Sequence, residues 1–369
     1  MLGTVLSVQA NYYWVRLDAI PVEVKTGGLM DDALLLCTRR SRLKKMGQQI
    51  WVGDRVQVEE PDWEGQRGAI SNVLPRTTEL DRPPVANASH ILLMFAMADP
   101  VLDPAQLSRF LVKAESTNLA VSLCLNKSDL VSEEAKGEWS DRLSQWGYQP
   151  MIISLSQQKG LDQLVQQLQP HNTIVSGPSG VGKSSLINQL IPTVEQRVNA
   201  VSGKLGRGRH TTRHVELFAL PTGGLVADTP GFNQPELDCF PRQLGQYFPE
   251  IRQRLSQQRC QFNDCFHRDE PNCIVRGDWE RYEHYLVFLE EAIARHEQQG
   301  QRSDKETATK VMSGQSGRDR VEPKLETKRY RRKSRRRETQ ELKDFRGDVR
   351  DMLTQEALTQ ETLAREQHD

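Results

Sequence analysis

A glycine-rich segment at residues 177–185 most strongly limits what this chain can fold into. It lies between a short apolar run, Thr173–Val175, and an apolar helical stretch, which is a strand–loop–helix setting. It matches the phosphate-loop pattern G-x-x-x-x-G-K-[ST] and comprises Gly177, Pro178, Ser179, Gly180, Val181, Gly182, Lys183, Ser184 and Ser185. Backbone N–H groups of such loops cradle phosphates, the lysine reaches the β- and γ-phosphates, and the hydroxyl binds Mg²⁺. The segment predicts a nucleotide site, with Ser184 as a magnesium ligand.

Residues 79–238 predict the α/β domain that this loop requires. Apolar runs such as ILLMFAMA, LAVSLCLN and NTIVSGPS alternate with helical stretches such as AQLSRFLVKAEST. This alternation predicts a mostly parallel sheet with helices on both faces. Ligands of such sheets bind at the carboxyl ends of the strands.

A base-reading motif follows the run LAVSLCL. A carboxylate at a strand end can accept hydrogen bonds from guanine N1–H and the exocyclic amine, two donors that adenine lacks, and such bonds discriminate by roughly 10⁴–10⁵. We expect Asp129 to read the base, Lys127 to lie over it and Asn126 to brace the pocket. Ser-Leu after the run PMII stands where guanine-nucleotide proteins usually carry Ser-Ala. The predicted base site comprises Asn126, Lys127, Ser128, Asp129, Ser154 and Leu155.

Two switch motifs follow the phosphate loop. Asp228-Thr-Pro-Gly231 ends a predicted strand, so Asp228 is expected to support Mg²⁺ through water and the Gly231 N–H to contact the γ-phosphate. Thr211 and Thr212 lie in the run GRGRHTT, and one hydroxyl, assigned to Thr212, is expected to complete the Mg²⁺ shell. Loss of the γ-phosphate would release both segments.

The order of these motifs is circularly permuted. Guanine-nucleotide proteins ordinarily run phosphate loop, threonine, DxxG, NKxD and Ser-Ala, whereas here NKSD and Ser154 come first. A parallel sheet tolerates permutation because the natural termini of a domain often lie close together. The permuted order leads the DTPG motif directly into a cysteine-rich segment.

Slow intrinsic hydrolysis is predicted from the residue after DTPG. Ras-like proteins carry a water-orienting glutamine there, but this chain has Phe232. His210, beside the switch threonines, is the candidate catalytic residue, because a histidine can position or polarise water near neutral pH. The alternative is a surface-loop histidine.

Residues 1–78 predict a small β-barrel. Five or so short runs, including GTVLSV, YYWVRL and DRVQVEE, are apolar or alternating and are separated by turn residues. The pattern leaves two interpretations open, an oligonucleotide-binding (OB) barrel or any small sandwich or barrel without nucleic-acid function. The basic run Arg39–Lys45 is expected to project from a loop.

Residues 239–298 are predicted to be helical and to contain a metal loop. Cysteine thiolates and one imidazole crowd into 14 positions, and the expected ligands of a tetrahedral Zn²⁺ are Cys260, Cys265, His267 and Cys273. Four protein ligands leave no open position for catalysis, so the metal is expected to be structural.

Composition indicates that the chain has no membrane helix and that its C-terminal residues form no packed core. No apolar run approaches the roughly 20 residues of a membrane helix, so we expect a cytoplasmic protein with no membrane partner. Residues 299–369 are charged and poor in aliphatic residues, which predicts a largely disordered tail. Within it Lys328–Arg337 is strongly basic and is either a solvated tail or a segment that contacts RNA phosphates.

Together these motifs resemble the circularly permuted RsgA (YjeQ) GTPase family over residues 1–295. The resemblance rests on PPVANAS, NKSD, GPSGVGKSS, GRGRHTT and DTPGF, with GTV, VGDRV and GAISNVLPR in the barrel. It implies an OB barrel, one zinc per chain, Mg²⁺ with GTP, and a monomer that binds the 30S ribosomal subunit and its 16S rRNA. It also implies a role in late subunit maturation, with GTP hydrolysis stimulated by the subunit.

Two other functions remain open from the residues themselves. One is an RNA-binding assembly scaffold that uses GTP only as a conformational ligand. The other is a phosphate-loop ATPase or kinase, against which NKSD argues.

Overall fold

The fold is described from a computed structural model of the chain. The described residues are 1–19, 34–81, 84–169, 171–191, 215–228, 236–306, 309–313 and 319–323. Residues 1–296 form one compact unit and residues 297–369 a second.

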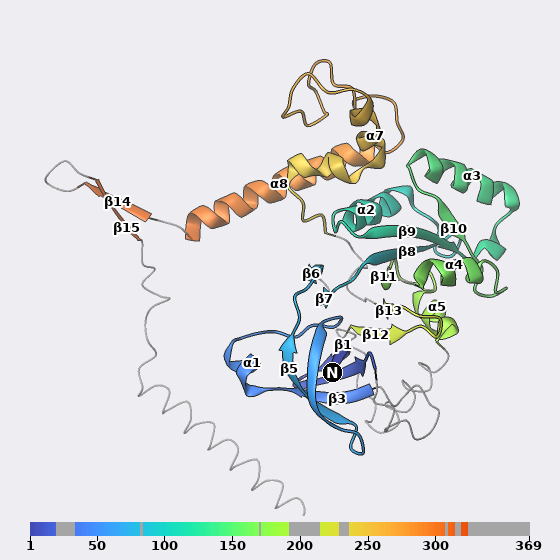
Figure 1. Ribbon diagram of the computed structural model, residues 1–369. Helices are drawn as coiled ribbons and strands as arrows, with labels where there is room; N and C mark the ends of the chain where they lie inside the picture. Colours follow the sequence, from blue (N-terminus) through green and yellow to red (C-terminus); the bar gives the residue numbers. More distant parts are fainter. Residues whose placement is uncertain are drawn as a thin grey trace, which may run out of the picture. The chain divides into compact units, whose positions relative to one another are not determined.

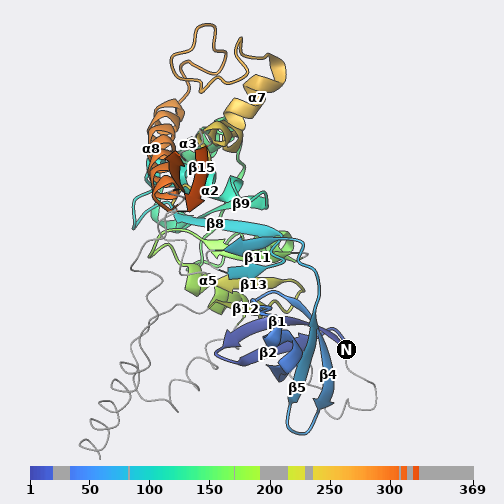
Figure 2. The same cartoon turned by 90° about the vertical axis from the view of Figure 1, so that its left-hand side faces the viewer.

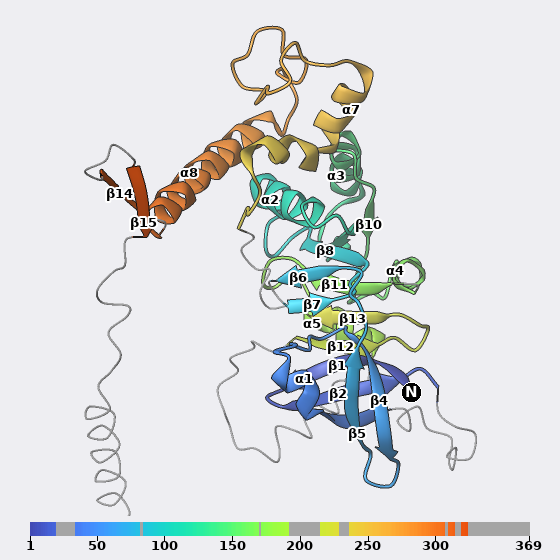
Figure 3. The same ribbon diagram turned by 60° about the vertical axis from the view of Figure 1, so that its left-hand side comes forward.

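Alternating apolar residues at the N-terminus form a closed five-stranded barrel, and Figure 3 shows its long β4–β5 hairpin. β1 pairs antiparallel with β2 and β4, β2 with β3, and β4 with β5, while β3 and β5 are parallel. Inward side chains such as Val15, Val58 and Ile70 are buried in its core, as the strand period of two requires. The predicted barrel is confirmed. Its strands are β1 (Leu2–Gln9), β2 (Tyr12–Leu17), β3 (Leu34–Arg39), β4 (Arg55–Asp62) and β5 (Arg67–Val73).

The basic run Arg39–Lys45 corrects one expectation. It was predicted to be a loop, but it contains a short helix, α1 (Ser41–Lys45). Leu43 is buried in the barrel core, so this single apolar residue packs the segment against the barrel.

A short hairpin connects the barrel to the next domain. β6 (Glu79–Asp81) and β7 (Pro84–Ala86) pair antiparallel, and an isolated bridge joins Val85 of β7 to Val52 of the barrel.

The central domain contains the predicted parallel sheet. Its strand order is β10-β9-β8-β11-β13-β12, and every neighbouring pair is parallel except β12–β13. β12 was not expected from the sequence, because it begins at the exposed Glu216 and shows no long apolar run. The strands are β8 (His90–Ala96), β9 (Ala120–Asn126), β10 (Pro150–Ile152), β11 (Asn172–Ser176), β12 (Glu216–Ala219) and β13 (Leu225–Asp228).

Helices cover both faces of this sheet, as Figure 1 shows. β8 is buried along its whole length, and its side chains alternate between two hydrophobic clusters. Phe95 and its alternate neighbours pack with α2 and α3, whereas Met94 and its alternate neighbours pack with α4 and α5. The helices are α2 (Pro104–Glu115), α3 (Glu133–Gln145), α4 (Leu161–Leu168) and α5 (Lys183–Leu190).

The sheet continues into the barrel. β12 pairs antiparallel with β1 through Ser7 and Glu216, and Figure 2 shows the two strands side by side. The first strand of the barrel therefore borders the edge strand of the central sheet.

The third region is helical. Its core contains Phe248, Val275, Tyr285 and Leu289, and Val112 of α2 joins it. Tyr285 and Phe248 meet edge to face, with ring centroids 5.4 Å apart. The elements are η5 (Pro241–Tyr247), α7 (Pro249–Gln257) and α8 (Tyr282–Glu306).

Buried Arg281 joins this region to the central domain. Its side chain is 0% exposed; Nη1 donates to both carboxylate oxygens of Glu250, at 3.2 and 3.1 Å, and Nε donates to the Ser108 hydroxyl at 3.0 Å. The guanidinium also lies over the rings of Trp146 and Phe248.

The segment expected to be a disordered tail contains some regular backbone. α8 extends to Glu306, and β14 (Thr309–Ser313) pairs with β15 (Asp319–Pro323). The basic run Lys328–Arg337 lies outside the described residues. Among the described helices, none has the length and apolarity needed to cross a bilayer.

Candidate nucleotide-binding site and metal centre

The phosphate loop occupies the turn between β11 and α5, as predicted. A Cβ at Gly177 would lie 2.0 Å from the Met94 carbonyl oxygen, and one at Gly182 would lie 2.6 Å from Asn126 Nδ2. Gly177, Gly180 and Gly182 all have positive φ, at 146°, 82° and 105°. At Gly177 and Gly182, glycine is therefore required by both the conformation and the close approach of residues of β8 and β9, and at Gly180 by the conformation alone.

Lys183 begins α5 and points back over the loop. Its ammonium donates to the carbonyl oxygens of Gly177 at 2.9 Å and Pro178 at 2.6 Å. The lysine charge and the N-terminus of α5 thus lie on the same loop, an arrangement that suits phosphate.

Asn126 joins the base-reading motif to the phosphate loop. Its Nδ2 donates to the Val181 carbonyl at 2.8 Å, and its Oδ1 accepts from the Leu155 N–H at 3.2 Å. One buried amide thus ties the end of β9 to the loops that follow β10 and β11. The bracing role predicted for Asn126 agrees with these contacts.

Asp129 is hydrogen-bonded by serines of the loop that follows β10. The Ser154 hydroxyl donates to Asp129 Oδ1 at 2.5 Å, and hydrogen bonds from Ser154 and Ser156 lower the carboxyl pKa. The backbone N–H of Ser128 donates to the Ile153 carbonyl at 3.2 Å. These hydrogen bonds orient the carboxylate and favour its ionised form.

Lys127 adopts a left-handed conformation, with φ of 60°. Its ammonium donates to the Asp99 carbonyl and lies 3.8 Å from the Asp99 carboxylate. This contact brings the loop after β8 beside the predicted base site.

The structure also adds neighbours that sequence reasoning missed. Asp99 and Ser156 had no recognised motif around them. Asp99 does follow a fully buried strand, and the carboxyl ends of parallel strands gather ligand-binding residues; that position was the available signal. Met94 could be found only from the close packing of β8 against the phosphate loop.

The switch residues are placed only in part. Asp228 ends β13 in register with Val175 of β11, the strand that leads into the phosphate loop. The remaining predicted switch residues, His210, Thr211, Thr212 and Gly231, lie outside the described residues.

Three thiols and one imidazole gather in the helical region, as predicted for the metal loop. The candidate ligand atoms of Cys260, Cys265, His267 and Cys273 all lie within 4.8 Å of one another. His267 Nδ1 is 3.6 Å from Cys260 Sγ and 3.5 Å from Cys273 Sγ, and these two sulfurs are 3.9 Å apart. A tetrahedral Zn²⁺ with ordinary bond lengths requires S–S edges of roughly 3.8 Å and S–N edges of roughly 3.6 Å. The donor set and its spacing fit zinc.

Surrounding contacts hold this loop in shape. Glu270 accepts the backbone N–H groups of Phe266 at 2.7 Å and Arg268 at 2.8 Å. Hydroxyls of α8 reach the loop backbone, because Tyr282 donates to the His267 carbonyl at 2.8 Å and Tyr285 to the Phe266 carbonyl at 2.7 Å. Such outer contacts orient metal ligands.

The fold and this site define a circularly permuted GTPase. A phosphate loop and a carboxylate base site meet at the carboxyl ends of parallel strands, but the base site precedes the loop in the chain. Solved structures agree. At a TM-score of 0.64, the chain matches YjeQ from Thermotoga maritima with 31% identity over 80% of this chain and 99% of that one. It matches YloQ, described as a circularly permuted GTPase, with 30% identity and the same score, over 80% of this chain and 95% of that one.

Sequence comparisons identify the family. The family model described as RsgA GTPase matches residues 73–238. The chain is 61% identical to the small ribosomal subunit biogenesis GTPase RsgA of Trichormus variabilis, covering 94% of this chain and 96% of the relative. It is 57% identical to that of Microcystis aeruginosa, covering 94% of each. The chain belongs to the RsgA family and is a GTP hydrolase.

Proposed function

We propose that this GTPase binds the small ribosomal subunit and assists its late maturation, and that the subunit stimulates GTP hydrolysis. The Asn126 amide, which joins the guanine-type motif to the phosphate loop at 2.8 Å, carries the nucleotide part of the proposal. The ribosomal part is supported by the names of relatives that align over nearly the whole chain.

The nucleotide would lie across the loops just described. Asp129 accepts the two guanine donors, the Lys127 stem lies over the base, and the backbone of Ser154-Leu155 contacts the base edge. Lys183 turns from the loop carbonyls to the β- and γ-phosphates. Residues 177–185 cradle the phosphates through their N–H groups.

Ser184 and Thr212 are the proposed magnesium ligands, and Asp228 acts through water. Mg²⁺ supplies positive charge that offsets the charge developing on the phosphates during transfer. The N–H of Gly231 contacts the γ-phosphate, so both switch segments report whether GTP or GDP is bound.

His210 is the proposed catalytic residue. Phe232 has no group that can orient water, so the chain needs another group near the γ-phosphate. The subunit would stimulate hydrolysis by ordering the segment that carries His210, which then positions the attacking water.

The helical region and the barrel are the proposed RNA-binding parts of the protein. One zinc per chain, held by Cys260, Cys265, His267 and Cys273, would fix the loop of the helical region. This region and the barrel would contact 16S rRNA from either side of the nucleotide site, with the protein acting as a cytoplasmic monomer.

GTP turnover with and without purified 30S subunits tests the proposal, with 50S subunits as the control particle. We expect slow turnover alone and strong stimulation by 30S only. Lys183→Ala should abolish hydrolysis, and His210→Ala should reduce stimulated hydrolysis by roughly 10²-fold while GTP affinity barely changes. Equal turnover with and without 30S would favour the scaffold alternative, and a fully active His210→Ala variant would remove the catalytic assignment.

A further inference from the structure

Trp51 is a half-buried indole beside the barrel that no hydrophobic cluster uses. It lies in the connection between α1 and β4. None of the four clusters found among the described residues includes it. By contrast, Trp63 packs against the barrel core and Trp146 is buried in the central domain. The Trp51 ring therefore has no evident role in core packing.

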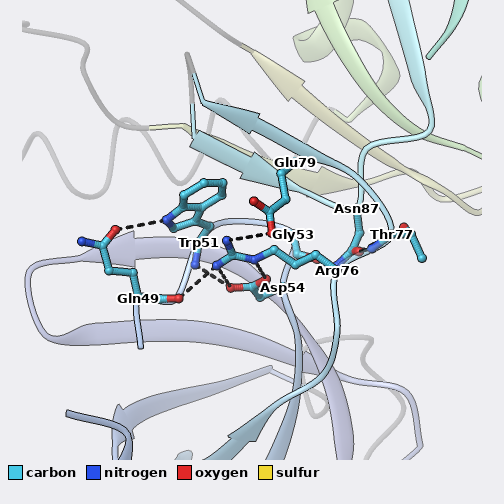
Figure 4. Close-up of polar contacts among 8 residues, drawn as sticks. All are labelled: Gln49, Trp51, Gly53, Asp54, Arg76, Thr77, Glu79 and Asn87. Carbon is cyan, nitrogen blue, oxygen red and sulfur yellow. Dashed lines mark hydrogen bonds and ion pairs between the residues drawn. The ribbon is translucent and has the colours of Figure 1, made fainter. Parts of the chain in front are cut away.

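One face of the indole is covered by a guanidinium, as Figure 4 shows. The Arg76 Cζ lies 3.9 Å from the centroid of the Trp51 ring. An arginine stacked on an indole adds cation–π attraction to the contact.

The guanidinium is itself fixed by a buried carboxylate. Arg76 Nε donates to Asp54 Oδ1 at 2.7 Å, and Nη2 donates to Asp54 Oδ2 at 3.0 Å and to the Gln49 carbonyl at 2.9 Å. The Asp54 side chain is 0% exposed. The third nitrogen, Nη1, lies 3.6 Å from the exposed Glu79 carboxylate. Since all three nitrogens face partners within the protein, Arg76 holds the ring rather than offering a phosphate contact.

The Trp51 backbone is held by the same carboxylate. Its N–H donates to Asp54 Oδ2 at 2.7 Å, and the indole Nε1–H reaches Gln49 Oε1 at 3.5 Å. Figure 4 shows these side chains converging on Arg76. The result is an aromatic ring in a preset orientation, which lowers the entropy that a ligand must overcome.

Cations lie close to Trp51 in the chain. Arg42, Lys44 and Lys45 of α1 are exposed, and within the described ranges they take part in no ion pair, whereas Arg40 pairs with Glu59 and Glu60. The connection from α1 to Trp51 is tied down, because Arg39 donates to the Gln48 carbonyl at 2.5 Å and Arg76 to that of Gln49.

We propose that Trp51, backed by Arg76, is a stacking platform for an unpaired base of single-stranded RNA, and that Arg42, Lys44 and Lys45 contact the adjacent phosphates. This rests on the proposed ribosomal function and names a site for it. A rigid aromatic ring, close in the chain to exposed cations that have no acidic partner among the described residues, fits single-stranded nucleic acid, since bases stack on aromatic rings while cations follow the backbone. The fixed Asp54–Arg76 pair positions the platform without touching the RNA.

Binding of a fluorescein-labelled U₁₂ oligoribonucleotide to the full chain tests this, with polyphosphate as a polyanion that lacks bases. Trp51→Leu should weaken U₁₂ binding by roughly 5- to 100-fold, the usual effect of losing one stacked base. It should leave polyphosphate binding unchanged. Replacing Arg42, Lys44 and Lys45 with glutamine should weaken binding of both. Trp51→Phe keeps a ring and should retain most of the U₁₂ affinity.

Trp139→Leu is the control, at an indole that packs against the core of the central domain. Trp139 is also half-buried and also lies under an arginine, Arg142, at 4.7 Å, but it lies on α3 beside Glu138, Asp141 and Glu280. The U₁₂ affinity of Trp139→Leu should equal that of the wild type. Wild-type U₁₂ affinity in Trp51→Leu, or an equal loss of U₁₂ and polyphosphate binding, would overturn the platform. Stimulation of wild-type GTP turnover by 30S is measured separately, so the proposed function can survive that result.

Discussion

At the scale of single residues, the backbone of the phosphate loop lies directly against the Asn126 side chain of the base site. The shape of each loop therefore depends on the other. Gly182 has φ of 105°, and its missing Cβ leaves room for Asn126 Nδ2. The same amide bonds to the Val181 carbonyl. Filling this space affects both loops.

Gly182→Ala should therefore lower GTP affinity by at least about ten-fold, because a left-handed conformation disfavours alanine and its Cβ displaces Asn126. Nucleotide titration followed by calorimetry measures this. Gly137→Ala is the control, since a Cβ there meets nothing within 4 Å and the site is helical; it should bind GTP normally and be slightly more stable. Unchanged affinity in Gly182→Ala would mean that the loop is not held as described.

At the scale of elements, the metal loop and the buried ion pair each hold the helical region together. The loop is built from ligands close in the chain, so its pattern was readable in the sequence. Arg281 was not found, because its partners Glu250 and Ser108 are brought to it only by tertiary packing.

Cys260→Ser should lose the metal and expose residues 240–295 to protease, because structural zinc binding is coupled to local folding. GTP binding should survive, since the nucleotide site lies on other elements. Elemental analysis and limited proteolysis provide the measurement, with about one zinc per wild-type chain expected. Cys239 is half-buried and is not one of the four candidate metal ligands. The control variant Cys239→Ser should therefore keep the metal. A metal-free wild-type chain with a protected helical region would contradict the assignment.

Arg281→Leu should destabilise the helical region by about 3–5 kcal/mol, because it leaves Glu250 buried without its partner. Burial raises the Glu250 pKa, and the charge of Arg281 opposes that rise. Without Arg281 the pKa rises further, so the loss of stability should be largest at high pH and should shrink on acidification, when Glu250 is protonated.

Denaturant unfolding at several pH values measures this effect. The double variant Arg281→Leu/Glu250→Leu removes both charges and should recover much of the stability. A single variant as stable as the wild type, or a loss that does not depend on pH, would show that the pair does not hold the region.

Short elements limited what the sequence could reveal. The strands of the central sheet were predicted because long apolar runs are typical of buried parallel strands. β12 begins at the exposed Glu216 and lacks such a run, and α1 has only five residues. The packing of α1 depends on Leu43, a single apolar residue among cations, which no periodicity could reveal. The NKSD motif could be recognised because it is contiguous, whereas Ser156 reaches Asp129 only through the folded loop after β10.

At the scale of the whole molecule, the barrel and the nucleotide domain share one sheet through β1 and β12. In the chain, β12 and β13 lie between the two switch motifs, because Thr211 and Thr212 precede β12 and Asp228 ends β13. The pairing of Ser7 with Glu216 therefore brings the barrel beside the strands that connect the switches. Such a long-range pairing could not be read from either strand alone.

The proposed function requires that a guanine-reading, permuted site performs hydrolysis that the small subunit stimulates. Asp129→Asn tests both halves in one measurement, because an amide can donate to the 2-oxo group of xanthine, whereas the carboxylate accepts from guanine. Turnover of GTP and of xanthosine triphosphate is measured for both proteins with saturating 30S subunits. We expect 30S-stimulated hydrolysis of GTP by the wild type and of xanthosine triphosphate by the variant. Equal GTP turnover by the two proteins would contradict this expectation.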